Sequence, residues 1–285
     1  MSKLKVSLLA SLLFASSFSF AETTVDITKP VKFDIINKGK EYEYSLSSVI
    51  DMWIKGEHNT LNDQEKMEFV MEAERLHLNE FEKREQAKEL IQRYNQYVQK
   101  AKNIIESIDY FTVFSYLSKM PYDEDKFSKK YDFDSQTYYF IGSPDKEKEL
   151  EDFNKRSRGN QRQIGWTSPL CVANNRVGID ERYFGPYSGG SMQINIPECK
   201  SAYIDFPAEE IKKLFYPEGK YSDRVGMFDE YNQYLKFKIK NNKKIIKDES
   251  GYSLDTTVED VEYYIATQDG DNYQIYYSVP IKYTK

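Results

Sequence analysis

The sequence has few of the residues from which common catalytic and metal sites are built. Its 285 residues include two cysteines, two histidines and two tryptophans. His58 and His77 are too far apart for a His-x-x-x-His metal motif, and the cysteines do not form a Cys-x-x-Cys pair. A Gly-x-Ser-x-Gly nucleophile motif is also missing. The sequence therefore predicts no catalytic residue, no metal site and no cofactor.

The sequence also has fewer positively charged residues than negatively charged ones. The chain has 40 lysines and arginines against 46 aspartates and glutamates, which gives a formal net charge of −6. Proteins that bind nucleic acid usually carry a net basic surface, so we expect no nucleic acid among the partners. Beyond its N-terminus the chain has no run of about 20 apolar residues, the length that a transmembrane helix needs. We expect no transmembrane segment in the mature chain.

The first 21 residues have the pattern of a secretory signal peptide. Lys3 and Lys5 form a positive start, Val6–Phe20 is apolar or small, and Ser19 and Ala21 suit the −3 and −1 positions of a cleavage site. A retained membrane anchor is the alternative, although the apolar stretch is short for a membrane span. We expect a soluble protein that is located in the periplasm or secreted.

The segment between the two cysteines carries four glycines and two stretches of strand-like alternation. We predict a hairpin whose tip is Gly185–Gly190, because glycines favour tight turns. This register sets Ile179 opposite Ile196 and Tyr183 opposite Met192.

Export favours a disulfide between Cys171 and Cys199, because disulfides form and persist outside the cytoplasm. In the predicted hairpin Cys199 faces Arg176 rather than Cys171. The disulfide would then tie the segment that precedes the hairpin to the open end of the hairpin.

The N-terminal part predicts a β-hairpin followed by amphipathic helices. Two stretches alternate between apolar and polar residues around a turn at Asn37–Lys40, with apolar members Val31, Phe33, Ile35, Tyr42, Tyr44 and Leu46. Ser47 or Ser48 can cap a short helix that Gly56 would end. Asn62 and Asn79 each begin a capping box, which predicts one helix to about Leu78 and another over Glu80–Ile108.

After Ile108 the apolar period changes to that of strands. Strand-like segments are Tyr110–Leu117, Gln136–Ile141, Ser191–Pro197, Gln233–Lys240, Val261–Thr267 and Tyr273–Ile281. Pro207 suits the first turn of a short helix, and Gln268–Tyr273 predicts a hairpin turn rather than a calcium loop. Gly142–Gly165 is rich in charge and is expected to be a surface excursion.

These patterns predict an α+β fold. Residues 1–21 are the signal peptide, residues 22–108 form a β-hairpin plus a helical segment, and residues 109–285 form a mainly antiparallel β-rich part with the disulfide-stapled loop and the short helix. Whether the two parts share one core stays open at this stage.

Two surfaces are candidates for ligand binding. One is the tip of the stapled hairpin, with the aromatic residues Tyr183, Phe184 and Tyr187. The other is a strip of lysines, Lys236, Lys238 and Lys240, on one face of a strand whose other face is apolar. The alternative for the strip is a solvated face that resists edge pairing.

The absence of catalytic motifs favours a non-enzymatic binding or envelope-accessory protein. Its abundant tyrosines, 24 beside 17 phenylalanines, predict strands and half-exposed aromatic surfaces. The expected partners are an envelope glycan, a lipid head group or another envelope protein. The alternative is a cell-envelope hydrolase that uses carboxylates dispersed along the chain.

Overall fold

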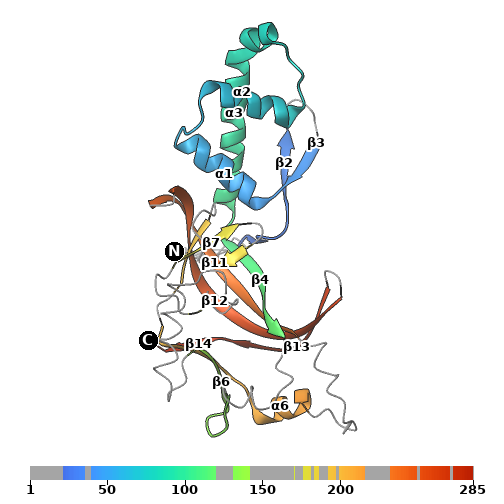
Figure 1. The fold of residues 1–285 in the computed structure, drawn as a ribbon, viewed down its shortest axis with the longest axis vertical. Coiled ribbons are helices and arrows are strands. Elements are labelled where there is room, and N and C mark those ends of the chain that lie inside the picture. The colour runs from blue at the N-terminus through green and yellow to red at the C-terminus, as the bar shows by residue number, and fades with distance from the viewer. Residues whose placement is uncertain are drawn as a thin grey trace, which may run out of the picture.

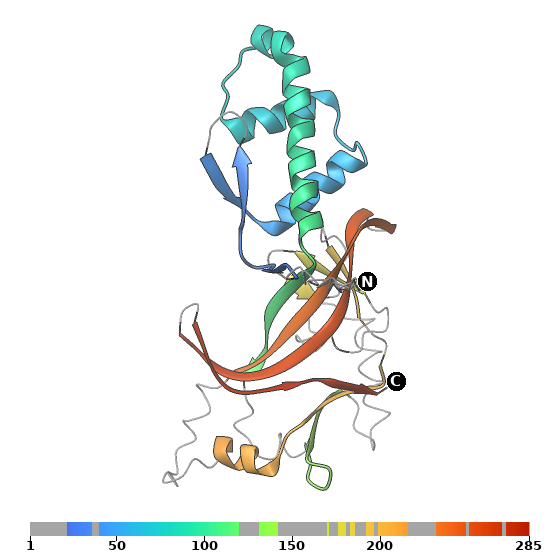
Figure 2. The same ribbon diagram turned by 180° about the vertical axis from the view of Figure 1, so that it is seen from behind.

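The computed structural model describes residues 22–35, 40–119, 131–141, 170, 176–180, 183–185, 192–196, 199–215, 232–248, 251–269 and 272–284. A helical head lies at one end of the molecule and the β-sheets lie at the other (Figure 1). The view from behind shows one long helix, α3, running through the head down to the sheets (Figure 2). The α+β class is confirmed.

A hairpin begins the head. Its strands β2 (Val31–Ile35) and β3 (Lys40–Tyr44) pair antiparallel, with Phe33 opposite Tyr42, as the alternation predicts. Phe33 is buried, and its ring stacks on that of Tyr97 with the ring centroids 5.9 Å apart. The apolar face of the hairpin therefore covers the helices.

Three helices follow: α1 (Leu46–Glu57), α2 (Asp63–Glu74) and α3 (Glu80–Ser107). Both predicted capping boxes are confirmed. At α3, the Asn79 side chain accepts from the Glu82 backbone N–H at 3.1 Å, and the Glu82 carboxylate accepts from the Asn79 N–H at 2.8 Å. Within the described residues, no helix is both long enough and apolar enough to cross a membrane.

Two predicted helix ends are wrong. Helix α1 is capped by Ser45 rather than Ser47 or Ser48, because the extended backbone of Ser45 lets its hydroxyl accept from the Ser48 N–H at 3.2 Å. Helix α2 ends at Glu74, four residues before Leu78, because Arg75 adopts a left-handed conformation with φ of 53°.

The prediction that Gly56 ends α1 is wrong, because this glycine lies inside the helix. The helix continues to Glu57, and a methyl group at Gly56 would overlap with both methyl groups of Val98 on α3. The glycine therefore lets α1 and α3 approach closely, which is a packing role that the local sequence does not reveal.

We expect Gly56→Ala to destabilise the protein by about 1–2 kcal/mol, because overpacking outweighs the gain in helix propensity. In a Val98→Ala background the same change should cost less, because the two methyl contacts at 2.3 Å are gone and only the Cβ of residue 98, at 2.8 Å, stays too close. Urea denaturation of the four proteins measures this coupling. A Gly56→Ala variant more stable than the wild type would show that the glycine acts only as a poor helix former.

Within the described residues, the β-rich part forms two sheets rather than one. The larger sheet has the order β1 (Thr24–Asp26), β4 (Tyr110–Lys119), β11 (Asn232–Asp248), β12 (Gly251–Asp269), β9 (Met192–Asn195), β7 (Arg176–Asp180) and β8 (Tyr183–Gly185), with β13 (Asn272–Pro280) also paired to β12. Most pairs are antiparallel, but β1 pairs with β4 and β9 with β12 in parallel. The predicted hairpin at Gln268–Tyr273 is confirmed, because Asp269 pairs with Asn272.

The second sheet has four strands in the order β14 (Lys282–Thr284), β10 (Ser201–Asp205), β6 (Thr137–Ile141) and β5 (Tyr131–Asp132). Its aromatic side chains meet the larger sheet: Phe140 lies 5.0 Å from Tyr263, and Phe206 stacks on Tyr277 at 4.8 Å between ring centroids. The short helix predicted after Pro207 is present as α6 (Ala208–Phe215). The segment Gly142–Gly165 lies outside the described residues.

The predicted hairpin with its tip at Gly185–Gly190 is wrong. The chain reverses earlier, so that Asp180 pairs with Tyr183, and β9 pairs with the other edge of β7 with Ile179 opposite Met192. The prediction used alternation within this segment alone, whereas β9 is also held by its parallel pairing with β12. Arg176 faces Asn195 and not Cys199. Because Cys171 lies outside the described residues, the disulfide stays a prediction.

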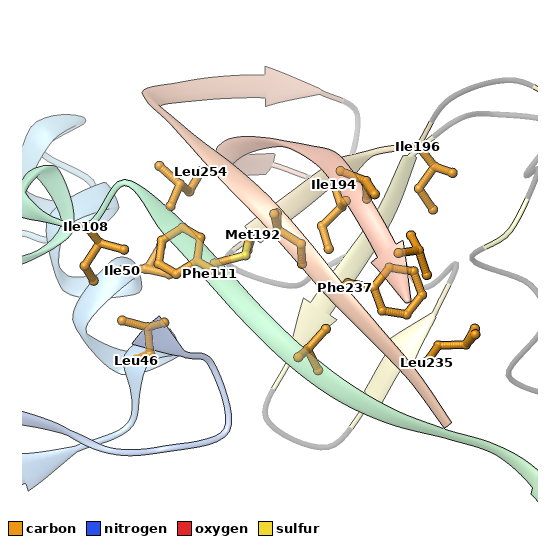
Figure 3. Close-up of a cluster of buried hydrophobic side chains, with 14 of the residues drawn as sticks. Leu46, Ile50, Ile108, Phe111, Met192, Ile194, Ile196, Leu235, Phe237 and Leu254 are labelled. Atoms are coloured by element: carbon orange, nitrogen blue, oxygen red, sulfur yellow. The ribbon is translucent and has the colours of Figure 1, made fainter. Parts of the chain in front are cut away.

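One buried apolar cluster runs through both the head and the sheets. Figure 3 shows the region where they meet, with Leu46 and Ile50 of α1 near Ile108 and Phe111, and with Leu254 and Met192 of the larger sheet beyond them. The two parts therefore share a core. The division of the chain at residue 108 stays a prediction.

The junction also holds a buried asparagine. Asn241 of β11 donates from its side-chain amide to the carbonyl of Ile105, at 2.8 Å, and to that of Ile108, at 2.9 Å. These carbonyls belong to the last turn and the cap of α3. The Ile105 carbonyl also accepts from the Ile108 N–H at 3.2 Å, and the Asn241 amide adds a second bond there and a bond to the Ile108 carbonyl. The Asn241 side-chain oxygen accepts from the Lys243 N–H at 2.9 Å, and this stabilises a β-bulge in β11.

We expect Asn241→Ala to lower the free energy of unfolding by about 2–3 kcal/mol, because it removes three hydrogen bonds made by a buried side chain, among them the bond to the Ile108 carbonyl. Asn242→Ala is the matched control, since the Asn242 amide bonds only half-buried side chains of β12, and should cost about 1 kcal/mol or less. Chemical denaturation measures both variants. Equal losses would contradict the special role of Asn241.

Candidate functional site

The aromatic tip predicted from sequence lies at an edge of the larger sheet. Tyr183 and Phe184 belong to β8, the terminal strand of the sheet order, where they face Asp180 and Ile179 of β7. Tyr187 lies outside the described residues. Because β12, β9 and β7 lie between β11 and β8 in the sheet order, the structure does not bring this tip together with the lysine strip.

The lysine strip has the predicted alternation. Lys236 and Lys240 are exposed and Lys238 is half-buried, whereas Leu235, Phe237 and Ile239 on the opposite face are fully buried. The bulge between β11 and β12 brings Glu259 beside the strip, with carboxylate oxygens 3.8 Å from the Lys238 Nζ and 3.9 Å from the Lys240 Nζ.

Further acidic groups balance the strip. Glu22 lies 3.7 Å from the Lys238 Nζ, which also sits 3.9 Å above the ring of Tyr110. Asp260 is opposite Lys238, and Glu262 is opposite Lys236 in the strand register. Four carboxylates therefore accompany three ammonium groups on this face. The strip stays a predicted anion site, but this balance weakens its attraction for polyanions.

A shallow groove of about 270 Å³ follows this face, lined by Thr24, Thr112, Lys236, Lys238, Asp260 and Glu262. Its lining groups carry both signs of charge. Among the described residues, no three His, Cys, Asp or Glu side chains gather in a way that could hold a metal ion.

A larger cavity, of about 460 Å³, lies in the helical head. Its walls come from four elements, β3, α1, α2 and α3, together with the loop that precedes α2 (Figure 1). The apolar part of the lining consists of Tyr44, Met52, Leu61, Phe69, Ala73 and Tyr94. A cavity of this size and composition is within the range that binds small molecules in proteins. We call it the head cavity.

The rim of the head cavity is polar. Helix α1 contributes Ser48, Asp51 and Lys55, and the last turn and cap of α2 contribute Glu72 and Arg75. The Lys55 ammonium lies 2.7 Å from the Asp51 carboxylate, and both side chains are about half exposed, at 45% and 48%. Such a pair contributes little to stability, so it can exchange for a ligand.

Tyr94 supplies the polar group in the interior. Its side chain is only 2% exposed, yet its hydroxyl finds no hydrogen-bond partner among the residues that the structure describes. Burial raises the pKa of Tyr94, and the negative charge of Asp51 raises it further. The hydroxyl is therefore protonated at neutral pH and able to donate. A buried hydroxyl without a partner costs about 1–3 kcal/mol.

Tyr97, one helical turn further along α3, shows the contrast. It is fully buried, and its hydroxyl donates to the Glu74 carboxylate at 3.0 Å. Glu74 is also buried and accepts from Arg93 at 2.9 Å. Phe69 packs its ring edge-to-face on both tyrosines. Two neighbouring tyrosines thus have the same burial, but only Tyr94 lines the cavity and lacks a partner.

Sequence reasoning did not find this site. Tyr94 occupies an apolar position in the 3.6-residue period of α3, and at such a position the periodicity predicts a core residue. The unpaired hydroxyl becomes visible only once α1, α2 and β3 are placed around α3. The acidic and basic residues of the rim lie at ordinary surface positions of their helices.

Comparison of the chain with protein-family models, with curated proteins and with solved structures finds no match.

Proposed function

We propose that the chain is an exported, non-enzymatic binding protein whose head cavity receives a small amphipathic molecule. The observation that carries this proposal is the head cavity of about 460 Å³, with Tyr94 in its lining, a side chain whose buried hydroxyl finds no hydrogen-bond partner among the described residues. The apolar body of a ligand would replace water along Tyr44, Phe69 and Met52, and one polar atom would hydrogen-bond to Tyr94.

The rim supports binding rather than hydrolysis. Glycosidases need one carboxylic acid kept protonated by apolar surroundings and a second carboxylate across the substrate. Asp51 is instead half exposed and paired with Lys55. The buried carboxylate of Glu74 is already bonded to Arg93 and Tyr97, so it serves the packing of α2 on α3.

Export and the disulfide belong to the same proposal. We expect the mature protein to begin after Ala21 and to contain oxidised Cys171 and Cys199, because the oxidising exterior favours the bond. Mass spectrometry of protein recovered from the periplasm or medium, before and after reduction and alkylation, measures both features. Free thiols in that fraction would contradict the disulfide, and an uncleaved N-terminus would contradict the signal peptide.

The cavity is tested with Tyr94→Phe and with 1-octanol as a neutral probe. We expect the variant to be as stable as the wild type or about 1 kcal/mol more stable, because an unsatisfied hydroxyl is removed. We expect its octanol affinity to fall about tenfold, because the hydrogen bond to the probe is lost. Denaturation and titration calorimetry measure the two effects.

Tyr97→Phe is the matched control on the same helix. It removes a hydroxyl that has a buried partner, so it should lose about 1–3 kcal/mol of stability and keep its octanol affinity. If Tyr94→Phe destabilised the protein as much as Tyr97→Phe does, the hydroxyl would have a structural partner and the proposal would be wrong. Octanol that fails to bind the wild type would contradict it as well.

A further inference from the structure

The head cavity has aromatic walls and a carboxylate in its lining. Three rings line it, from Tyr44, Phe69 and Tyr94, and the Asp51 carboxylate lies at the rim above them. Aromatic faces attract organic cations, and they do so more strongly where water is excluded. Burial raises the pKa of Tyr94, and the negative charge of Asp51 raises it further.

The C-terminal end of α2 adds to the negative potential that Asp51 and the aromatic faces create in the cavity. Glu72 and Ala73 lie in the last turn of the helix, and both line the cavity. A helix C-terminus carries partial negative charge, which favours a cation within one turn. On this wall the exposed side chains of Glu72 and Arg75 carry opposite charges, so their formal charges cancel. The partial negative charge of the helix end then remains as the net contribution of this wall.

Lys55 is the competing cation. Its ammonium lies 2.7 Å from Asp51, and because both groups are about half exposed the pair is weak. A ligand ammonium that enters the cavity can replace Lys55 at Asp51, while the flexible lysine side chain turns into solvent. The lysine thus shows that this carboxylate accepts an ammonium group at the mouth of the cavity.

From these contacts we infer that the head cavity is selective for organic cations, namely an amine or quaternary ammonium group joined to an apolar body. The inference rests on the proposed binding function and names its ligand class. The cationic group lies between Asp51 and the aromatic rings, and the apolar body fills the remaining volume. An amine also donates an N–H to Asp51, whereas a quaternary ammonium group, which has no N–H, is attracted by charge and by the aromatic rings alone.

Three probes of equal chain length test the selectivity: octylammonium, 1-octanol and octanoate. We expect octylammonium to bind the wild type about tenfold more tightly than octanol, and octanoate to bind more weakly than octanol. Titration calorimetry at low and at physiological salt measures the order. Octanoate binding more tightly than octylammonium, with octanol still bound, would overturn the cation inference and leave the proposed cavity intact.

Two charge variants at the rim sharpen the test. Asp51→Asn should weaken octylammonium about tenfold, leave octanol unchanged and strengthen octanoate, because Lys55 loses its partner. Lys55→Gln should strengthen octylammonium, because the competing cation is gone. Lys213→Gln on α6 is the matched control for Lys55→Gln, because it also removes a lysine that lies 2.7 Å from a neighbouring carboxylate, and no effect on probe binding is expected. Unchanged selectivity in Asp51→Asn would contradict the role of Asp51.

A variant with a filled cavity tests whether the probes bind in the head cavity at all. Ala73→Phe places a ring in the cavity and should abolish binding of octylammonium and octanol alike. If the probes still bind this variant, they occupy another site, and both the cation inference and the head-cavity function are wrong.

Discussion

The buried amide of Asn241 is the interaction on which the arrangement of head and sheets depends. It caps the end of α3 from a bulge in β11, so the longest helix and the central strand of the larger sheet meet through hydrogen bonds of fixed direction. Apolar packing at the junction, with Phe111 and Leu254 buried there, is compatible with many relative angles (Figure 3). The asparagine selects one of them. Asp109 reinforces it by accepting from the Lys243 ammonium at 2.8 Å, a contact that lowers the pKa of Asp109.

With α3 fixed in this way, the rest of the head is organised around it. Gly56 brings α1 into close contact near Val98, and the Glu74–Arg93–Tyr97 bonds hold the end of α2 against the middle of α3. The head cavity lies where these two attachments leave α1 and α2 apart. The same geometry that satisfies the hydroxyl of Tyr97 therefore leaves that of Tyr94 without a partner.

The parts that local chemistry determines could be predicted from sequence. The capping boxes at Asn62 and Asn79, the first hairpin and the alternation of the lysine strip each depend on residues a few positions apart. The register of β7 with β9 depends on the distant strand β12, and the bulge at Asn241 depends on the end of α3. These features, like the close approach at Gly56 and the head cavity, arise from segments far apart in the chain. Periodicity carries no information about them.

The two candidate surfaces differ in how well their polar groups are already satisfied. On the sheet, Lys238 and Lys240 have carboxylate neighbours in Glu22 and Glu259, so a charged ligand must displace existing partners for little net gain. In the head, the Tyr94 hydroxyl is buried and finds no hydrogen-bond partner in the part of the chain that the structure describes. A ligand that bonds to it recovers that lost free energy in addition to its own burial. The number of charges on a surface is therefore a poor guide to a binding site. A buried hydroxyl that lacks a partner offers a ligand more binding free energy than lysines that are already paired with carboxylates.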